Sequence, residues 1–370
     1  MGSGRLSRRK TIALGSAVAA LAGLSACKAS GGVAQAQTQT AVLGSTTGQA
    51  TAQRPSTTSS VGTSASSTAP ASQMTTASQL ATSSRTTAQT AQPGAAVDWK
   101  AVGGALGKAG QLMAGDVYRV GLPRTDLNVT VGGVPVQPAL ALGSYAAFKS
   151  TGDQAMVMGD LVLLDQEVQA VVDGLFAGGL SIDALHNHLN EMSPHVMYMH
   201  YSGMGDPVQL ATALKKALGA SATPFGGSSA ATASAGPQLD TKQIEGIVGH
   251  TGTMAAGGVF QVSIPRAEKI TEDGLELPPA MGTAIALNFQ PTSDGKAAIT
   301  GDYVLVGTEV NPVARALRQN GIQVTALHSH ALADEPRLFY VHFWANDDAV
   351  QLAKGLRAAL DKTKSAKPSA

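Results

Sequence analysis

The sequence predicts an α+β protein built from two diverged tandem repeats. Each repeat is expected to form an antiparallel sheet with helices on one face, ferredoxin-like in character, with the two repeats in pseudo-twofold association. The prediction rests on residues that recur 142 positions further along the chain, and on alternating apolar runs interleaved with helix start and stop signals. We expect repeats at 98–218 and 240–362, a linker at 219–239 and a tail at 363–370.

Chemically distinctive residues keep this offset most closely. His186, His188 and His200 match His328, His330 and His342. Gly159-Asp160 recurs as Gly301-Asp302, and Glu167-Val168 as Glu309-Val310. Between about 125 and 158 the copies share almost nothing. Because the repeats have diverged this far and still keep all three histidines, these histidines are not incidental.

Composition excludes some functions and restricts others. The chain has 370 residues, with 26 Lys+Arg against 25 Asp+Glu, so it offers no bulk charge for nucleic acid and no nucleic-acid partner is expected. Its one cysteine excludes an intrachain disulfide and a cysteine-based zinc site. A metal in this protein must therefore be held by histidine and carboxylate.

Residues 1–27 have the pattern of an export signal. Basic residues precede an apolar run at 12–24, which is short for a membrane span. The run ends in Leu24-Ser25-Ala26-Cys27, which resembles the lipobox of bacterial lipoproteins. We expect lipidation of Cys27 and anchoring to a bacterial membrane on its extracytoplasmic side, periplasmic or cell-surface. The alternative is a plain secretory signal with an incidental cysteine.

Ser7-Arg8-Arg9 resembles a twin-arginine motif, although Thr11 departs from it, so the Tat and Sec routes both stay open.

Residues 28–97 are rich in Ala, Ser, Thr and Gln, with no apolar period. A segment of this composition cannot bury enough apolar surface to offset its ordering entropy. We expect a disordered tether between the lipid and the globular repeats.

The second repeat shows its elements most clearly. Expected strands are 259–264, 283–289, 299–307, 322–330 and 338–344. Asn311-Pro312 predicts a helix start, and Asn320-Gly321 its end. Asp347 or Asp348 is expected to cap the last helix. Strands and helices in this order predict a sheet covered by helices on one face.

Strand geometry predicts that the histidines of each repeat converge. Residues two apart on a strand share a face, so His328 and His330 point the same way. Tyr340, His342 and Trp344 should form one face of the returning strand, opposite Phe339, Val341 and Phe343. A turn centred near Glu335, or near Ser193 in the first repeat, would place His328 directly opposite His342.

Three converging imidazoles predict a divalent-metal site in each repeat. Zn²⁺ is the default expectation, and Cu²⁺ and Ni²⁺ suit the same ligands. Such a metal could serve a hydrolase or a lyase through its bound water, or be captured without catalysis. Glu167 and Glu309 could each be a fourth ligand, a partner of an imidazole N–H, or a helix-start residue.

A different class of function fits the same residues. The histidines and tyrosines of a polar sheet face could hydrogen-bond an organic ligand or an envelope polymer without any metal. Stoichiometric metal binding separates the two hypotheses. The sequence does not identify catalytic residues, a substrate or the oligomeric state.

The globular part also resembles the LppY/LpqO family of bacterial lipoproteins. The resemblance is carried mainly by Gly301-Asp302-Tyr303-Val304-Leu305, by Val324–His330 and by Tyr340-Val341-His342-Phe343-Trp344-Ala345. The His-Asn-His pattern of the family stands at His186-Asn187-His188, whereas Ser329 replaces the asparagine in the second repeat. The resemblance covers roughly 98–360 and implies an envelope lipoprotein of unassigned activity.

Overall fold

The computed structural model describes residues 97–226, 238–292 and 296–367, which belong to one compact unit spanning 84–370. The expected signal peptide, Cys27 and all but the last residue of the 28–97 tether lie outside the described residues. Within the described part, no helix is both long and apolar enough to cross a membrane.

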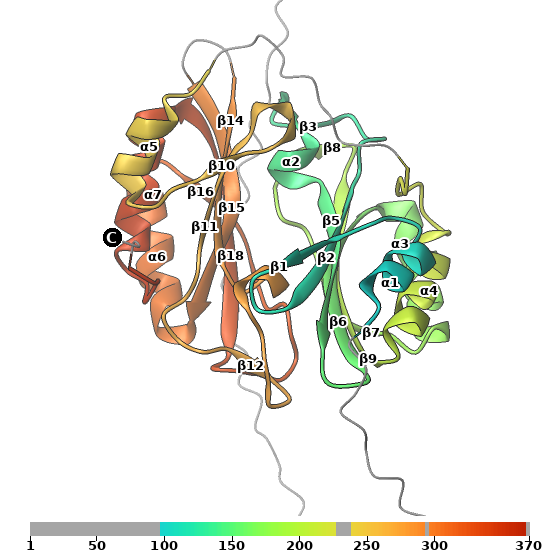
Figure 1. The fold of residues 1–370 in the computed structure, drawn as a ribbon. Helices are drawn as coiled ribbons and strands as arrows, with labels where there is room; N and C mark the ends of the chain where they lie inside the picture. The colour runs from blue at the N-terminus through green and yellow to red at the C-terminus, as the bar shows by residue number, and fades with distance from the viewer. Residues whose placement is uncertain (1–96, 227–237, 293–295, 368–370) are drawn as a thin grey trace, which may run out of the picture. The chain divides into compact units, whose positions relative to one another are not determined.

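Each repeat forms a six-stranded antiparallel sheet, and the two sheets have the same strand order (Figure 1). In spatial order the first sheet contains β1 Gln111–Met113, β2 Val117–Pro123, β5 Gly143–Ser150, β6 Ala155–Leu164, β9 Val196–Gly205 and β7 Ser181–His186. The second contains β10 Thr253–Met254, β11 Phe260–Ile264, β14 Ile285–Pro291, β15 Lys296–Val306, β18 Leu338–Asp348 and β16 Gln323–His328. The predicted α+β architecture of two tandem repeats is therefore confirmed.

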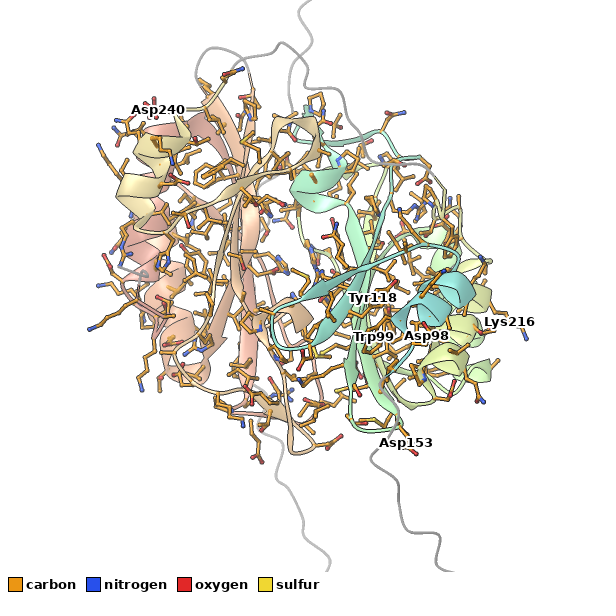
Figure 2. All side chains as sticks on the ribbon, in the orientation of Figure 1. Asp98, Trp99, Tyr118, Asp153, Lys216 and Asp240 are labelled. Carbon is orange, nitrogen blue, oxygen red and sulfur yellow. The ribbon has the colours of Figure 1, made fainter. Side chains whose placement is uncertain are left out.

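Helices cover one face of each sheet, as Figure 1 shows. The first repeat carries α1 Trp99–Leu106, α3 Asp165–Ala177 and α4 Pro207–Leu218, and the second carries α5 Thr241–Val248, α6 Gly307–Gln319 and α7 Ala349–Leu360. Asp98 caps α1 by accepting hydrogen bonds from the backbone N–H groups of Lys100 and Ala101. The ring of Trp99 stacks on Tyr118 with ring centroids 5.3 Å apart, which fixes this helix on β2 (Figure 2).

Each repeat also contains a small three-stranded sheet. A three-stranded sheet joins β4 Val134–Val136, β3 Val129–Val131 and β8 Met192–Ser193, and its counterpart joins β13 Leu275–Glu276, β12 Thr271–Glu272 and β17 Asp334–Glu335. The short helix α2 Pro138–Ala141 and the 3₁₀ turns η1 Ala256–Gly258 and η2 Pro279–Met281 complete the fold.

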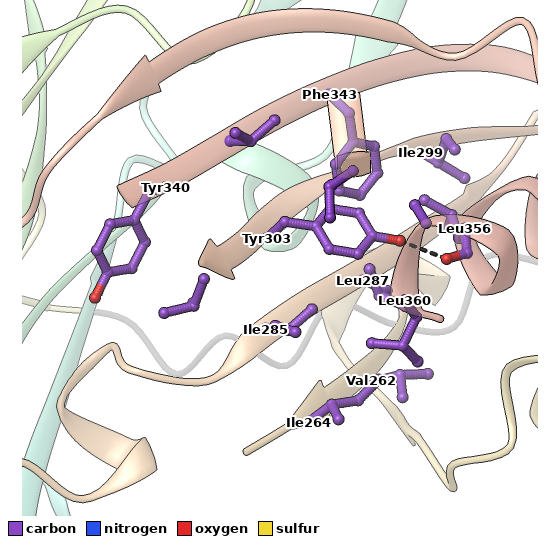
Figure 3. Close-up of a cluster of buried hydrophobic side chains, with 14 of the residues drawn as sticks. Val262, Ile264, Ile285, Leu287, Ile299, Tyr303, Tyr340, Phe343, Leu356 and Leu360 are labelled. Carbon is purple, nitrogen blue, oxygen red and sulfur yellow. Dashed lines mark hydrogen bonds between the residues drawn. The ribbon is translucent and has the colours of Figure 1, made fainter. Parts of the chain in front are cut away.

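Alternation along the strands sorts side chains between the helix-covered face and the opposite face. Phe343 and Tyr303 pack tilted on the helix side with ring centroids 5.6 Å apart. The hydroxyl of Tyr303 donates a hydrogen bond of 2.6 Å to the carbonyl oxygen of Leu356 in α7 (Figure 3). Tyr340 and His342 lie on a different side of β18, since both stack with the histidines described below. Apolar residues facing the helices form the core of each repeat. The opposite face carries the histidines together with a further buried apolar cluster, which joins Leu140 of the first repeat to Trp344 of the second.

The helix start predicted at Asn311-Pro312 is wrong. Helix α6 begins at Gly307, and Pro312 lies within it. The side chain of Glu309 accepts a hydrogen bond of 3.0 Å from the backbone N–H of Val306, which caps the first turn. In the first repeat α3 begins at the equivalent position with no Asn-Pro pair. The glutamate therefore sets the start in both repeats.

The two repeats contact each other through the sheet faces that carry no helices. Gln290 is 6% exposed and spans this contact: its Nε2 donates to the carbonyl oxygen of Pro135 at 2.7 Å, and its Oε1 accepts from the backbone N–H of Gln137 at 2.7 Å. Gln261 donates to the carbonyl oxygen of Ala139 at 2.8 Å. Polar groups buried between the repeats thus find partners across them.

Candidate functional site

Four strands bring the six repeated histidines to the contact between the repeats. His200 and His342 lie on the interior strands β9 and β18, and both are 2% exposed. His186 and His328 are the last residues of β7 and β16, and both are half-buried. His188 and His330 follow two residues later, beyond the strand ends. The expected strand at 322–330 is therefore shorter than predicted.

The register expected for the second hairpin is wrong. His342 pairs with Ala326, and His328 pairs with Tyr340 rather than with His342. The first repeat has the equivalent pairs Ala184 with His200 and His186 with Tyr198. A bulge at Thr325 shifts the ladder in β16. Because the displacement is two residues, the histidines stay on the same face of the sheet, and the rings of His328 and His342 still lie 4.8 Å apart.

The two histidine triads form one cluster across the repeats. The closest contacts between them join His186 to His328, His188 to His342 and His200 to His330, with ring centroids 3.5, 3.7 and 3.8 Å apart. Exchanging the repeats converts the second contact into the third and returns the first to itself. The contact is thus isologous, as between the subunits of a twofold dimer.

Two overlapping groups of side chains in this cluster could hold a metal ion. The ligand atoms of each group lie within 4.8 Å of one another, and the groups are His186, His188, His200 and His328, and Asp302, His328, His330 and His342. His328 belongs to both. The sequence predicted one separate site in each repeat, whereas the structure joins them through this shared residue.

Hydrogen bonds made by Nδ1 of three rings determine which ring nitrogen is free to bind a ligand. Nδ1 of His342 lies 3.0 Å from the carbonyl oxygen of Gly301, and Nδ1 of His328 lies 3.3 Å from that of Ser329. A carbonyl oxygen only accepts, so Nδ1 carries the proton in both rings. His186 is held in the same way, 3.0 Å from the carbonyl oxygen of Asn187. In their neutral forms these rings therefore present Nε2 as a bare lone pair.

The bare nitrogens converge. Nε2 of His328 and Nε2 of His342 lie 2.6 Å apart. Among the described residues, Nε2 of His186, His188, His200 and His330 is buried without a hydrogen-bond partner. Buried polar atoms in proteins nearly always have partners, so unpartnered imidazole nitrogens gathered around two facing lone pairs indicate a site for a positively charged group.

Burial favours the neutral form of His186, His188, His200, His328 and His330, because it lowers the pKa of each. It lowers the pKa of His200 and His330 well below the usual value, and neighbouring imidazoles lower it further. Burial also lowers the pKa of the half-buried His186 to about 4. Neutral imidazole is the form that ligates metals, so no proton has to be displaced from these residues at pH 7.

Asp160 and Asp302 are the carboxylates of the site, and the sequence reasoning missed them. Oδ1 of Asp302 lies 2.8 Å from Nδ1 of His342, and Oδ2 of Asp160 lies 3.8 Å from Nε2 of His188. Burial, followed by the charge of Asp302, raises the pKa of Asp160 well above its usual value. Recurrence of both residues at the common offset was the signal that could have found them.

Glu167 and Glu309 lie elsewhere, so the structure does not place them as ligands. Glu167 accepts two hydrogen bonds from Arg124, at 2.7 and 3.2 Å, and Glu309 accepts the same pair from Arg266. Glu167 also accepts from the backbone N–H of Leu164 at 2.9 Å, at the start of α3. Of the roles considered for these glutamates, the one at the helix start is the one that this geometry shows.

Two tyrosine rings stack on the outer histidines of the cluster, one in each repeat. The ring of Tyr198 lies 3.4 Å from that of His188, and the ring of Tyr340 lies 3.3 Å from that of His330, measured between centroids. The hydroxyl of Tyr198 donates to the carbonyl oxygen of Ala141 at 2.9 Å rather than to a histidine. These tyrosines therefore position the imidazoles by stacking and leave their nitrogens free.

A cavity of about 400 Å³ lies between the two sheets and reaches the cluster. The cluster supplies His188, His200, His330 and His342 to its wall, together with Asp160 and Asp302. Both repeats contribute other lining residues, among them Arg119, Tyr145 and Asn288. A small molecule in this cavity would contact the histidines directly.

These features define a two-repeat protein with a histidine-rich site between its halves. Residues 100–220 and 242–362 each match the family described as Domain of Unknown Function (DUF1259), and the chain belongs to that family. The double match confirms that the two halves are repeats of one unit. No curated protein matches the chain.

Two solved structures show a distant likeness. The trimeric bacterial microcompartment shell protein PduB is 14% identical, with a TM-score of 0.19, over 70% of this chain and 96% of that one. EtuB from Clostridium kluyveri is 9% identical, with a TM-score of 0.18, over 70% of this chain and 97% of that one. Scores this low carry no argument about fold or function.

Proposed function

We propose that this protein binds a divalent metal ion at the histidine cluster between its repeats. The observation that carries the proposal is the 2.6 Å approach of Nε2 of His328 to Nε2 of His342, while the Nδ1 of each ring is bonded to a carbonyl oxygen. Two lone pairs facing each other repel unless a positive charge lies between them. A shared proton or a metal ion supplies that charge, and four further unpartnered nitrogens favour the metal.

The ligand set favours a borderline first-row cation. Imidazole nitrogens with one or two carboxylate oxygens suit Zn²⁺, Cu²⁺ or Ni²⁺, and Zn²⁺ is the default choice. At zinc–nitrogen distances of about 2.0–2.1 Å, two ligands of a tetrahedral site are about 3.4 Å apart. His328 and His342 would therefore separate slightly around the ion.

Sharing of His328 limits the number of ions. Its Nδ1 is engaged with the carbonyl oxygen of Ser329, so only its Nε2 is available as a ligand. The two groups of four cannot both be complete at the same time. We therefore expect one tightly bound ion per chain, and a second ion would have three protein ligands at most.

A catalytic role, as a hydrolase or lyase, is the finer part of this proposal. A divalent ion lowers the pKa of a bound water towards 7 and polarises a carbonyl or phosphoryl oxygen. Asp160 lines the same cavity, and its Oδ1 has no hydrogen-bond partner among the described residues. Its carboxyl group is thus placed to accept a proton from a ligand held in the cavity.

Metal analysis of the protein tests the proposal. The full-length protein would be purified without a histidine tag, loaded with Zn²⁺, Cu²⁺ or Ni²⁺ and assayed by mass spectrometry. We expect about one equivalent, lost in His328→Ala and reduced in His186→Ala. His195→Ala is the matched control, because His195 is 48% exposed and pairs with Asp165 outside the cluster. No uptake of any of the three ions would overturn the proposal and favour an organic ligand bound by the histidines.

We also propose that the chain is an envelope lipoprotein of the LppY/LpqO family, anchored through Cys27. The proposal is supported by the lipobox, by the basic and apolar regions before it, and by the motifs of the resemblance. Expression with a radiolabelled fatty acid tests it. Label in the membrane fraction, lost in Cys27→Ser, is the expected result, and an unlabelled soluble wild type would contradict it.

A further inference from the structure

One arginine breaks the symmetry of the cavity that reaches the histidines. Arg119 of β2 lines the cavity, and Gln261 occupies the equivalent position of the second repeat. The side-chain amide of Gln261 already donates a hydrogen bond to the carbonyl oxygen of Ala139. Among the described residues that line the cavity, Arg119 is the one arginine or lysine, and it comes from the first repeat.

The partners of Arg119 leave most of its hydrogen-bonding capacity free. Among the described residues, its Nη1 donates to the carbonyl oxygen of Ala280, and its guanidinium carbon lies 3.5 Å from the ring centroid of Tyr145. Neither partner is a carboxylate. The two buried arginines differ from Arg119, since Arg124 and Arg266 each bind two carboxylates. Asp160 lies near enough for the charge of Arg119 to lower its pKa, but it accepts no hydrogen bond from the guanidinium. The free donors of this half-buried guanidinium are suited to an oxyanion.

Apart from the carboxylates of Asp160 and Asp302, two polar side chains of the cavity wall near Arg119 are donors or already have a partner. Tyr145 lies under the guanidinium, and burial raises the pKa of its hydroxyl to about 12, so it stays protonated and able to donate. The amide of Asn288 donates to the carbonyl oxygen of Leu140 at 3.4 Å. This end of the cavity therefore favours a ligand that accepts hydrogen bonds.

We infer that the cavity binds a small oxyanion, a carboxylate or a phosphate, between Arg119 and the metal ion. The inference rests on the proposed function, because the ion supplies the second contact. A volume of about 400 Å³ suits a small molecule rather than a polymer chain. Arg119 is thus a specificity-determining residue, which holds the charged end of the ligand while another oxygen reaches the ion.

Anion binding to the metal-loaded, full-length protein tests the inference. Acetate and inorganic phosphate are the two probes, and the Co²⁺-loaded protein reports their approach to the ion through its visible absorption. We expect at least one probe to bind, and Arg119→Gln to weaken it by about 10- to 100-fold without loss of metal, as for a charged hydrogen-bonded pair. Arg119→Lys should recover part of the affinity. Arg315→Gln removes an exposed charge elsewhere and should match the wild type.

The outcomes separate this inference from the proposed function. Preference for acetate or for phosphate identifies which oxyanion the site takes. If metal binds but neither probe does, or if Arg119→Gln binds the probe as the wild type does, the inference is overturned and the metal site stands. If the wild type takes no metal, the proposed function fails and the inference fails with it.

Discussion

Substitution of Glu167 separates a structural role from a metal-binding role. Glu167 is 8% exposed, and the side chain of its partner Arg124 is fully buried. Arg124 donates to Glu167 at 2.7 and 3.2 Å, and Glu167 also accepts the backbone N–H groups of Leu164 and Ala222 at 2.9 and 3.0 Å. Glu167→Gln keeps the shape of the side chain but removes the charge that all four donors face.

The expected loss of stability comes from the charge of Arg124, which stays buried in the variant. Breaking a buried ion pair by removing one partner costs about 3–5 kcal/mol, because the remaining charge has no counterion. Asp126 still contacts Arg124 at 2.9 Å and compensates in part, so we expect about 3 kcal/mol. For a domain of this size, that loss lowers Tm by roughly 6–12 °C. Metal content should not change, since Glu167 lies outside both groups of ligands.

Thermal unfolding and metal analysis of the same preparations measure both quantities. Glu309→Gln in the second repeat is the matched variant, because Arg266 repeats the pair at 2.7 and 3.2 Å. The double variant Arg124→Met/Glu167→Met should recover much of the lost stability, since no buried charge remains. If Glu167→Gln lost its metal while keeping its Tm, the assignment of Asp160 and Asp302 as the carboxylates of the site would be refuted.

Three further predictions follow from single contacts. Burial, with the charge of Glu272 as a smaller cause, raises the pKa of Asp183 to about 6. The folded state therefore holds a proton that the unfolded chain releases near pH 4, and this contribution to stability is present below pH 4 and lost as pH rises through 6. Asp183→Asn should stabilise the protein by roughly 1 kcal/mol at pH 7, allowing for solvent screening, and change little at pH 3.5. Gly301→Ala should destabilise the fold by more than about 2 kcal/mol, because a Cβ would collide with the backbone carbonyl of Ala286 on the adjacent strand. Gln290→Leu should cost about 1–2 kcal/mol, since it removes two part-buried hydrogen bonds, to the backbone N–H of Gln137 and the carbonyl oxygen of Pro135, between the repeats.

Chemical denaturation checks all three, at two pH values for Asp183→Asn. Equal effects of that variant at pH 3.5 and 7 would contradict the assigned pKa. Wild-type stability of Gly301→Ala would contradict the close approach of β14 and β15. Gln137→Ala keeps the backbone N–H that Gln290 accepts and is the control for Gln290→Leu, so the two variants should differ.

Local sequence patterns were enough to predict the strand faces, the repeats and one helix cap. Two-residue alternation belongs to the strand itself, so the sequence alone could place His328 and His342 on a face opposite Phe343. The constant offset of 142 positions identified the repeats, and the same local chemistry led to an Asp N-cap at Asp348, which the structure has. The predicted helix start failed at Pro312 because an equally local signal, the Glu309 cap, lay further upstream.

Long-range contacts decided the site. Whether His186 meets His328 depends on how one sheet packs against the other. Asp302, rather than Glu309, lies beside an imidazole because it pairs with His342 in the register of β15 and β18. These contacts join residues 142 and 40 positions apart, and no local pattern contains them. The sequence by itself determined the repeats, the strand faces and the presence of histidine chemistry. Only the tertiary structure turned two triads into one shared cluster, because their meeting depends on the packing of one repeat against the other.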